Sequence, residues 1–83
     1  MYFVYILKSL SDKNHYIGCT TDLERRISEH NAGKTVSLKG RRPLVLLYSE
    51  TYDNQEAAYK REKQIKSYKA GVAFKKLIQG GVA

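Results

Sequence analysis

Glu62 is the acidic residue whose position most directly indicates chemistry, and it lies in the basic C-terminal part of the chain. Between residues 60 and 76 the sequence has seven Lys or Arg and a single acid, Glu62. At helical spacing Ala58, Glu62 and Ile65 share one face, so this carboxylate lies along the apolar side of a predicted helix. A half-buried carboxylate needs a compensating cation, several hydrogen-bond donors or a metal ion. The simpler alternative is an exposed ion pair with Lys66, one turn later.

The remaining acids do not form a second cluster. They lie in a predicted turn or in the first turns of helices, or have no assigned role: Asp12, Asp22, Glu24, Glu29, Glu50, Asp53 and Glu56. This distribution disfavours a two-metal site for phosphoryl transfer. It leaves at most one hard cation, held mainly by Glu62 and by water or phosphate oxygens.

Two tyrosines are candidates for acid–base or positioning roles. If the first two strands pair so that Val4 lies opposite Ile17, then Tyr5 lies opposite Tyr16, with Cβ atoms about 5 Å apart. In this register the missing side chain of Gly18 leaves a gap into which a ligand or another backbone can approach. The alternative is a cross-strand aromatic pair that only fills the core.

A third candidate pair lies on a predicted helix. Arg26 and His30 are four residues apart and border the Leu23/Ile27 apolar stripe, so their side chains are neighbours beside the core. The structural alternative places the Arg26 stem over apolar surface and His30 near the helix C-terminus, where it complements the dipole.

The elements that must position these residues follow from the apolar pattern. Residues 2–7 are apolar on both alternating faces, which is typical of a central strand. Two more strands are predicted over 15–19 and 44–50, and helices over 22–30, from about 53 to 68, and 72–79. Thr21 with Glu24, and Asp53 with Glu56, have the spacing of capping boxes. This order predicts an α/β (α+β) fold, a small three-stranded antiparallel sheet flanked by two to three helices.

Length and charge limit the classes of protein. A chain of 83 residues and 9.5 kDa makes one domain, which we place at 1–79 with 80–83 as a frayed terminus. A net charge of +7 and a pI near 9.6 favour a polyanionic partner. The single cysteine, Cys19, excludes an internal disulfide framework, and no apolar run approaches a membrane span. We therefore expect a cytoplasmic protein with no membrane partner.

Basic residues in two segments predict the nucleic-acid contacts. They lie in a loop that contains the only proline and on the second helix: Lys34, Lys39, Arg41, Arg42, Lys60, Lys63 and Lys66. Such residues can straddle a phosphate backbone without reading the bases.

Taken together, the spaced residues resemble the GIY-YIG nuclease domain. The sequence has Phe3-Val4-Tyr5 and, after ten intervening residues, Tyr16-Ile17-Gly18. Arg26 follows ten positions after Tyr16, His30 four positions after Arg26, and Glu62 lies on a later helix. The resemblance covers nearly the whole chain and is greatest for the small stand-alone bacterial members. It implies that fold, and a metal-dependent endonuclease that hydrolyses phosphodiester bonds in DNA, selecting structure rather than sequence.

The resemblance also implies roles for individual residues. Glu62 would bind Mg²⁺ or Mn²⁺, Arg26 would neutralise charge on the phosphate, and Tyr5 and Tyr16 would position and deprotonate water. His30 would relay a proton or orient Tyr5. A free phenol is a weak base at neutral pH, so this role requires nearby cations that favour the phenolate. The substrate would be branched, single-stranded or duplex DNA, with RNA as a further candidate.

Two other functions remain open. Many members carry an asparagine after the glutamate, and no asparagine follows Asn54 here. This absence favours a non-catalytic module that binds structured RNA, a ribosome or DNA through the same basic surface. The small size of the chain favours a scaffold that recruits a protein partner.

Overall fold

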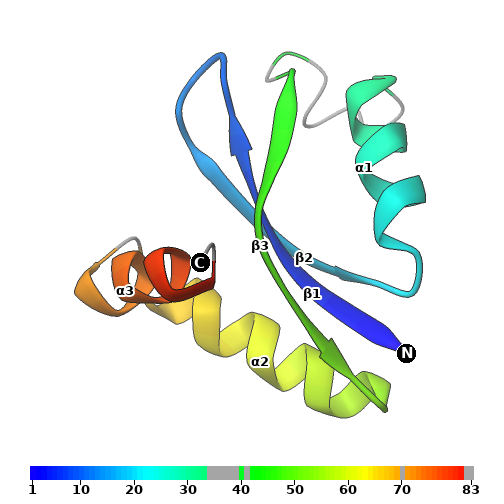
Figure 1. Cartoon of the computed structure of the whole chain (residues 1–83), viewed down its shortest axis with the longest axis vertical. Helices are drawn as coiled ribbons and strands as arrows, with labels where there is room; N and C mark the ends of the chain where they lie inside the picture. The colour runs from blue at the N-terminus through cyan, green and yellow to red at the C-terminus, as the bar shows by residue number, and fades with distance from the viewer. Residues whose placement is uncertain (34–39, 41, 70, 82–83) are drawn as a thin grey trace.

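The structure, a computed structural model, is a three-stranded antiparallel sheet with helices on both faces (Figure 1), and it describes residues 1–33, 40, 42–69 and 71–81. The strands are β1 (Tyr2–Ser9), β2 (His15–Thr20) and β3 (Leu44–Tyr52). The helices are α1 (Leu23–Asn31), α2 (Gln55–Ser67) and α3 (Val72–Gly81). The strand order β2-β1-β3 places β1 at the centre, and the predicted fold class is confirmed.

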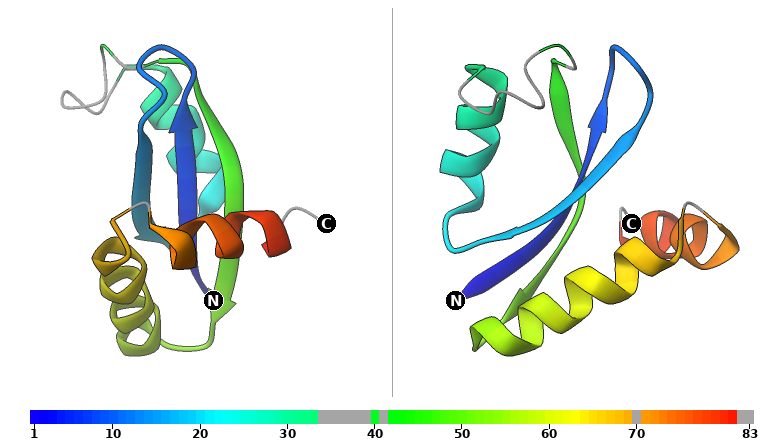
Figure 2. Two further views of the ribbon diagram at one scale, coloured as in Figure 1. Left: turned by 90° about the vertical axis from the view of Figure 1, so that its left-hand side faces the viewer. Right: turned by 180° about the vertical axis from the view of Figure 1, so that it is seen from behind.

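The sheet separates two hydrophobic clusters, as Figure 2 shows with α1 on one face and α2 and α3 on the other. Val4 and Ile6 pack with Ala58, Ile65 and Phe74 from α2 and α3. The intervening positions of β1 turn to the opposite face, where Tyr5 and Leu7 pack with Leu44 and, from α1, with Leu23 and Ile27. Since successive strand residues alternate between faces, the wholly apolar β1 is covered on both sides.

The register of the β1–β2 hairpin differs by two residues from the predicted one. Tyr5 lies opposite Gly18 rather than Tyr16, and Val4 lies opposite Cys19 rather than Ile17. A slip of two residues leaves every side chain on its original face, so the apolar pattern fits both registers equally well. The predicted register was therefore wrong, although it placed each side chain on the correct face.

The loop explains which register forms. The sequence predicts a loop longer than the tight turns, but the predicted register, if paired to its end, would close on Leu10 and Ser11, neither of which favours the positive φ of two-residue turns. In the observed loop Lys13 takes a φ of 65°, and its N–H donates to the Ser9 carbonyl at 3.0 Å. The longer loop thus satisfies its backbone locally and brings Gly18 opposite Tyr5.

Both sheet-flanking helices begin one residue later than the capping boxes predict. Asp22 caps α1 by accepting from the Arg25 N–H at 3.1 Å, and Asn54 caps α2 by accepting from the Ala57 N–H at 2.8 Å. Asp and Asn are at least as good N-caps as Thr, which explains the shift from Thr21.

None of the helices in the described ranges is long and apolar enough to cross a membrane.

A carboxylate network ties β3 to α2. Glu50, whose side chain is 17% exposed, accepts from Arg61 through Nε at 2.8 Å and Nη2 at 2.9 Å. The hydroxyls of Tyr48 and Tyr52 also donate to Glu50. Burial raises the pKa of Glu50, but the hydrogen bonds from Arg61 and the two tyrosines outweigh it and lower this pKa to about 2. Glu50 is thus an anion held by four donor groups.

We expect Glu50→Gln to lower the free energy of unfolding at pH 7 by about 1–3 kcal/mol, because it leaves the guanidinium of Arg61 without its anion. Glu56→Gln removes an exposed partner of Lys60 and should cost less than about 0.5 kcal/mol. Urea denaturation of both variants measures the difference. Equal costs would contradict a stabilising role for the network.

The same network predicts a dependence on acid. The pKa of Glu50 is lowered from 4.5 to about 2 in the folded chain, so its stabilisation is fully present above pH 4.5 and is lost as the pH falls toward 2. The stability difference between the wild type and Glu50→Gln should therefore shrink across this window.

Candidate active site

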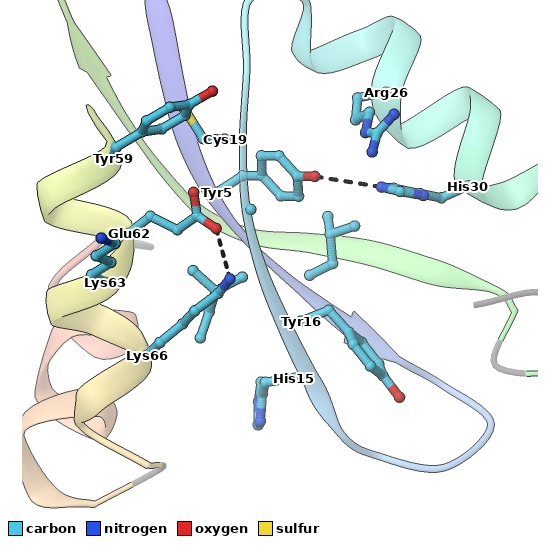
Figure 3. A pocket seen from close by; sticks show the side chains of 13 residues that line it. Tyr5, His15, Tyr16, Cys19, Arg26, His30, Tyr59, Glu62, Lys63 and Lys66 are labelled. Atoms are coloured by element: carbon cyan, nitrogen blue, oxygen red, sulfur yellow. Dashed lines mark hydrogen bonds and ion pairs between the residues drawn. The ribbon is translucent and has the colours of Figure 1, made fainter. Parts of the chain in front are cut away.

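The candidate site residues converge on one cavity of about 840 Å³ at the β2 edge of the sheet (Figure 3). All five predicted catalytic residues line it: Tyr5, Tyr16, Arg26, His30 and Glu62. They come from β1, β2, α1 and α2, so the cavity joins elements from both faces of the sheet.

The absence of a side chain at Gly18 allows residues from the two faces of the sheet to line one cavity. Tyr5 packs on the α1 face and Glu62 lies on α2, on the other face, with edge strand β2 between them. A Cβ built on Gly18 would lie 2.6 Å from Tyr5 Cζ and closer still to the hydroxyl oxygen. The phenol therefore occupies the space that any other residue at position 18 would need.

Tyr5 and His30 form a buried pair on the α1 side. Tyr5 is only 5% exposed and His30 only 3%, and the Tyr5 hydroxyl lies 3.4 Å from His30 Nε2. Burial, and secondly the charge of Arg26, lower the pKa of His30 below its ordinary value of 6.5. His30 is therefore neutral at pH 7, and in the tautomer that carries its proton on Nδ1 it accepts a hydrogen bond or a proton at Nε2.

The Tyr5 phenol is not held as a phenolate. The role expected from the sequence required nearby cations that favour the phenolate, and this requirement is not met. Burial raises its pKa above 10.0, and although the hydrogen bond and charge of Arg26 lower it, burial is the larger effect. The negative charge of Glu62 raises it further. Tyr5 is thus a neutral phenol in this protein, with a neutral imidazole beside it.

Glu62 lies in the cavity and is paired. Its side chain is 20% exposed, and its Oε2 accepts from the Lys66 ammonium at 2.7 Å. The carboxylate is therefore half-buried, and the cation that compensates its charge is the ammonium of Lys66 one turn later. The two buried neighbours on its helical face, Ala58 and Ile65, hold this part of α2 against the sheet.

The donor set at Glu62 fits a single hard cation. No group of three His, Cys, Asp or Glu side chains gathers anywhere in the described ranges. Mg²⁺ is commonly bound through one or two carboxylates plus waters and substrate phosphates, so Glu62 alone can be its protein ligand. The ammonium of Lys66 already places one cation at this carboxylate.

Tyr16 lines the cavity, but its hydroxyl is directed elsewhere. It donates to Asp12 Oδ2 at 3.0 Å, and Asp12 lies in the hairpin loop outside the cavity lining. In Figure 3 the Tyr16 hydroxyl points away from the group formed by Tyr5, Arg26 and His30. The two phenols are therefore on the same face but do not form an opposed pair.

The predicted nucleic-acid contacts lie in three different places. Lys63 and Lys66 line the cavity, whereas Lys60 is exposed on α2 and pairs with Glu56 at 3.5 Å. Arg42 is exposed, lies outside the cavity and donates to the Asn31 carbonyl at 3.3 Å. The remaining three, Lys34, Lys39 and Arg41, fall outside the described residues.

The cavity is also lined by His15, Cys19 and Tyr59, which sequence reasoning did not assign to the site. Burial, and then the charge of Glu62, raise the pKa of the Cys19 thiol. Tyr59 precedes Glu62 by three residues, and helical spacing alone could have placed it one turn from that carboxylate.

The close approach at Gly18 can be tested by adding one methyl group. We expect Gly18→Ala to displace the Tyr5 ring and to cost about 1–3 kcal/mol of stability, as overpacking does in a filled site. Gly40→Ala is the matched control, because a Cβ there meets nothing within 4 Å. Thermal denaturation and the NMR shifts of the Tyr5 ring measure both effects. Unchanged Tyr5 shifts in Gly18→Ala would refute the contact.

The electrostatics of His30 can be tested by NMR titration. We expect its midpoint to lie below 6.5 and to rise toward 6.5 in Arg26→Gln, because that variant removes a cation that repels the imidazolium. Arg25→Gln removes an exposed charge from the same helix and serves as the control. A wild-type midpoint above 6.5 would contradict the buried, neutral imidazole.

Comparisons with known proteins find a matching family model and several relatives. Residues 1–73 match the family model described as the GIY-YIG catalytic domain. The UPF0213 protein of Haloquadratum walsbyi is 47% identical over 68 residues, which are 81% of this chain and 75% of that protein. The UPF0213 protein of Staphylococcus epidermidis is 40% identical over 80 residues, which are 95% of this chain and 96% of that protein.

A solved structure gives the same result. The solution NMR structure of a UPF0213 protein from Bacillus halodurans has 36% sequence identity and a TM-score of 0.50, over 81% of this chain and 72% of that one. The family model covers most of the chain, including every candidate catalytic residue. The chain therefore belongs to the GIY-YIG nuclease family, among relatives that are small UPF0213 proteins.

Proposed function

We propose that this chain is a metal-dependent endonuclease that hydrolyses phosphodiester bonds in DNA and selects its substrate by structure rather than by sequence. The observation that carries the proposal is the convergence of a phenol, an imidazole, a guanidinium and a carboxylate on one cavity. Membership of a nuclease family supports the reaction class, while metal, substrate and residue roles belong to the proposal.

Arg26 is the residue best placed to bind the scissile phosphate. It lines the cavity together with Tyr5 (Figure 3) and is exposed, so its guanidinium is accessible to a ligand. Guanidinium groups bind phosphate oxygens in bidentate fashion and stabilise charge that develops on them. Arg26 would therefore hold the phosphate on the α1 side of the cavity.

Tyr5 and His30 would move the proton of the attacking water. A neutral phenol accepts a hydrogen bond from water through its oxygen and donates its own proton to a neighbour. His30 Nε2, 3.4 Å away, is that neighbour, and its lowered pKa leaves it neutral and able to accept. This route needs no preformed phenolate, and the contact of Tyr16 with Asp12 favours Tyr5 over Tyr16 for this role.

Glu62 would hold the divalent cation, Mg²⁺ or Mn²⁺, across the cavity from Arg26. When bound, such an ion polarises a phosphate oxygen and stabilises a departing alkoxide. Glu62 Oε2 would exchange the ammonium of Lys66 for the ion, and the freed Lys66, with Lys63, would then face the DNA backbone.

The proposal is tested by incubating purified protein with branched, single-stranded and duplex DNA in Mg²⁺ or Mn²⁺. Glu62→Gln keeps the shape of the side chain but removes the anion, and should reduce cleavage at least about 100-fold while DNA binding is retained. Arg26→Ala should reduce cleavage by about 10²–10³-fold through lost charge stabilisation. Arg25→Ala removes the same charge from the same helix outside the cavity, and should cleave like the wild type.

Two outcomes would count against the endonuclease. Cleavage that is unchanged in both Glu62→Gln and Arg26→Ala would come from a contaminant. Binding without cleavage of any DNA structure would favour the non-catalytic nucleic-acid-binding module.

A further inference from the structure

We propose that Tyr59 is the stacking platform of a nucleobase subsite beside the catalytic cavity, and that the DNA strand bound there has an unpaired base next to the scissile phosphate. The proposal rests on the proposed function, because it takes the phosphate to lie between Arg26 and Glu62. It adds a binding site on the outer surface of α2 and a reason for selecting one DNA structure over another.

Tyr59 is an unusual residue for its position. It is 48% exposed in the middle of α2, although the apolar side of this helix is formed by the buried Ala58 and Ile65. The nearby tyrosines of the Glu50 network, Tyr48 and Tyr52, are half-buried and donate to that carboxylate. The ring of Tyr59 therefore leaves apolar surface exposed among polar side chains, where packing gives no reason for it.

A second hollow borders this residue. It has a volume of about 380 Å³ and is lined by Tyr59 together with Gln55, Glu56, Lys60 and Lys63. Tyr59 and Lys63 also line the catalytic cavity, so the two spaces share these residues of α2 as a common border. Figure 3 shows the Tyr59 ring at the margin of the cavity, beside Cys19 and above Glu62 and Lys63.

The chemistry of this hollow suits a nucleobase. The Gln55 amide donates to the Tyr59 hydroxyl at 2.6 Å, which restrains the ring before any ligand arrives. Aromatic rings stack on bases of any type, and adjacent cations bind the phosphates on either side. Lys60 and Lys63 supply those cations, and the Gln55 carbonyl oxygen can accept from an exocyclic amine.

The spacing along α2 decides which base is bound. Tyr59 and Glu62 are three residues apart, which is about 4.5 Å along a helix axis and on the same surface. A base on Tyr59 therefore belongs to a nucleotide that adjoins the phosphate in the cavity. Bases in a duplex are stacked on their neighbours, so one of them must be unpaired and turned outward to cover the ring.

The experiment measures binding in the absence of metal, so that it does not depend on cleavage. Fluorescence anisotropy compares wild type, Tyr59→Ala and Tyr59→Phe on a labelled single strand of about twelve nucleotides and on the duplex of the same sequence. Leu46→Ala is the control, because it truncates a side chain that is 42% exposed but lines neither cavity. A series of single strands, each with one abasic position, locates the stacked base.

We expect Tyr59→Ala to weaken single-strand binding by about tenfold, while Tyr59→Phe stays within about twofold because the ring face is retained. Duplex binding should change little in either variant, and the Tyr59→Ala effect should vanish when one particular base is missing. Equal losses on single strand and duplex, or no loss on either, would overturn the subsite.

These outcomes are separable from the endonuclease test. A chain that shows the Tyr59 pattern but cuts no DNA has the subsite without the catalysis. A chain that cuts DNA through Glu62 and Arg26 but ignores Tyr59→Ala has the catalysis without the subsite.

Discussion

The contact on which the rest of the site depends is the packing of the Tyr5 ring against the bare backbone of Gly18. A sheet normally isolates the side chains of its two faces, because each strand presents alternate residues to opposite sides. Because Gly18 on the edge strand β2 has no side chain, the Tyr5 ring lies against its backbone and brings the hydroxyl to this edge of the sheet. A residue held by α1 packing and a residue carried by α2 can therefore share one cavity, which would otherwise be divided by β2.

The two half-buried carboxylates on the α2 face differ in how strongly their surroundings hold them. Glu50 is saturated by the guanidinium of Arg61 and by two phenols, and its pKa falls to about 2. Glu62 accepts from the flexible ammonium of Lys66, and no other donor to it is seen among the described residues. A cation that binds Glu50 would have to break its hydrogen bonds with Arg61 and the two tyrosines, whereas a cation that binds Glu62 displaces only the Lys66 side chain. The first carboxylate holds β3 to α2, and the second is available to a ligand.

Burial governs the acid–base character of the α1 side. Tyr5 and His30 are both nearly inaccessible, so each is held in its neutral form, the phenol by a raised pKa and the imidazole by a lowered one. Arg26 nevertheless acts on both, since it favours the phenolate and disfavours the imidazolium. Its charge thus makes the phenol a better proton donor than burial alone would allow, while keeping its neighbour able to accept.

Much of the fold was predictable because it rests on local patterns. The doubly apolar run of β1 predicted a central strand, and the helical spacing of Ala58, Glu62 and Ile65 predicted a carboxylate beside the core, as the structure has them. The helix starts were missed by one residue, because Thr21 and Asp22, and Asp53 and Asn54, are adjacent residues with similar capping ability. The spacing of Tyr48, Glu50 and Tyr52 places them on one face of β3, but no spacing along the chain relates them to Arg61 on α2, so the network as a whole could not be found.

By itself, then, the sequence determined which residues could do chemistry and on which face of a strand or helix each would lie, because side-chain direction follows from the periods of the backbone. The tertiary structure alone decided the register that sets Tyr5 on Gly18, because two registers two residues apart present identical faces and differ only in loop geometry. It also decided that Tyr16 turns to Asp12 and that Tyr59 stands at the mouth of the cavity. Those outcomes depend on distances between elements, which no periodicity along the chain encodes.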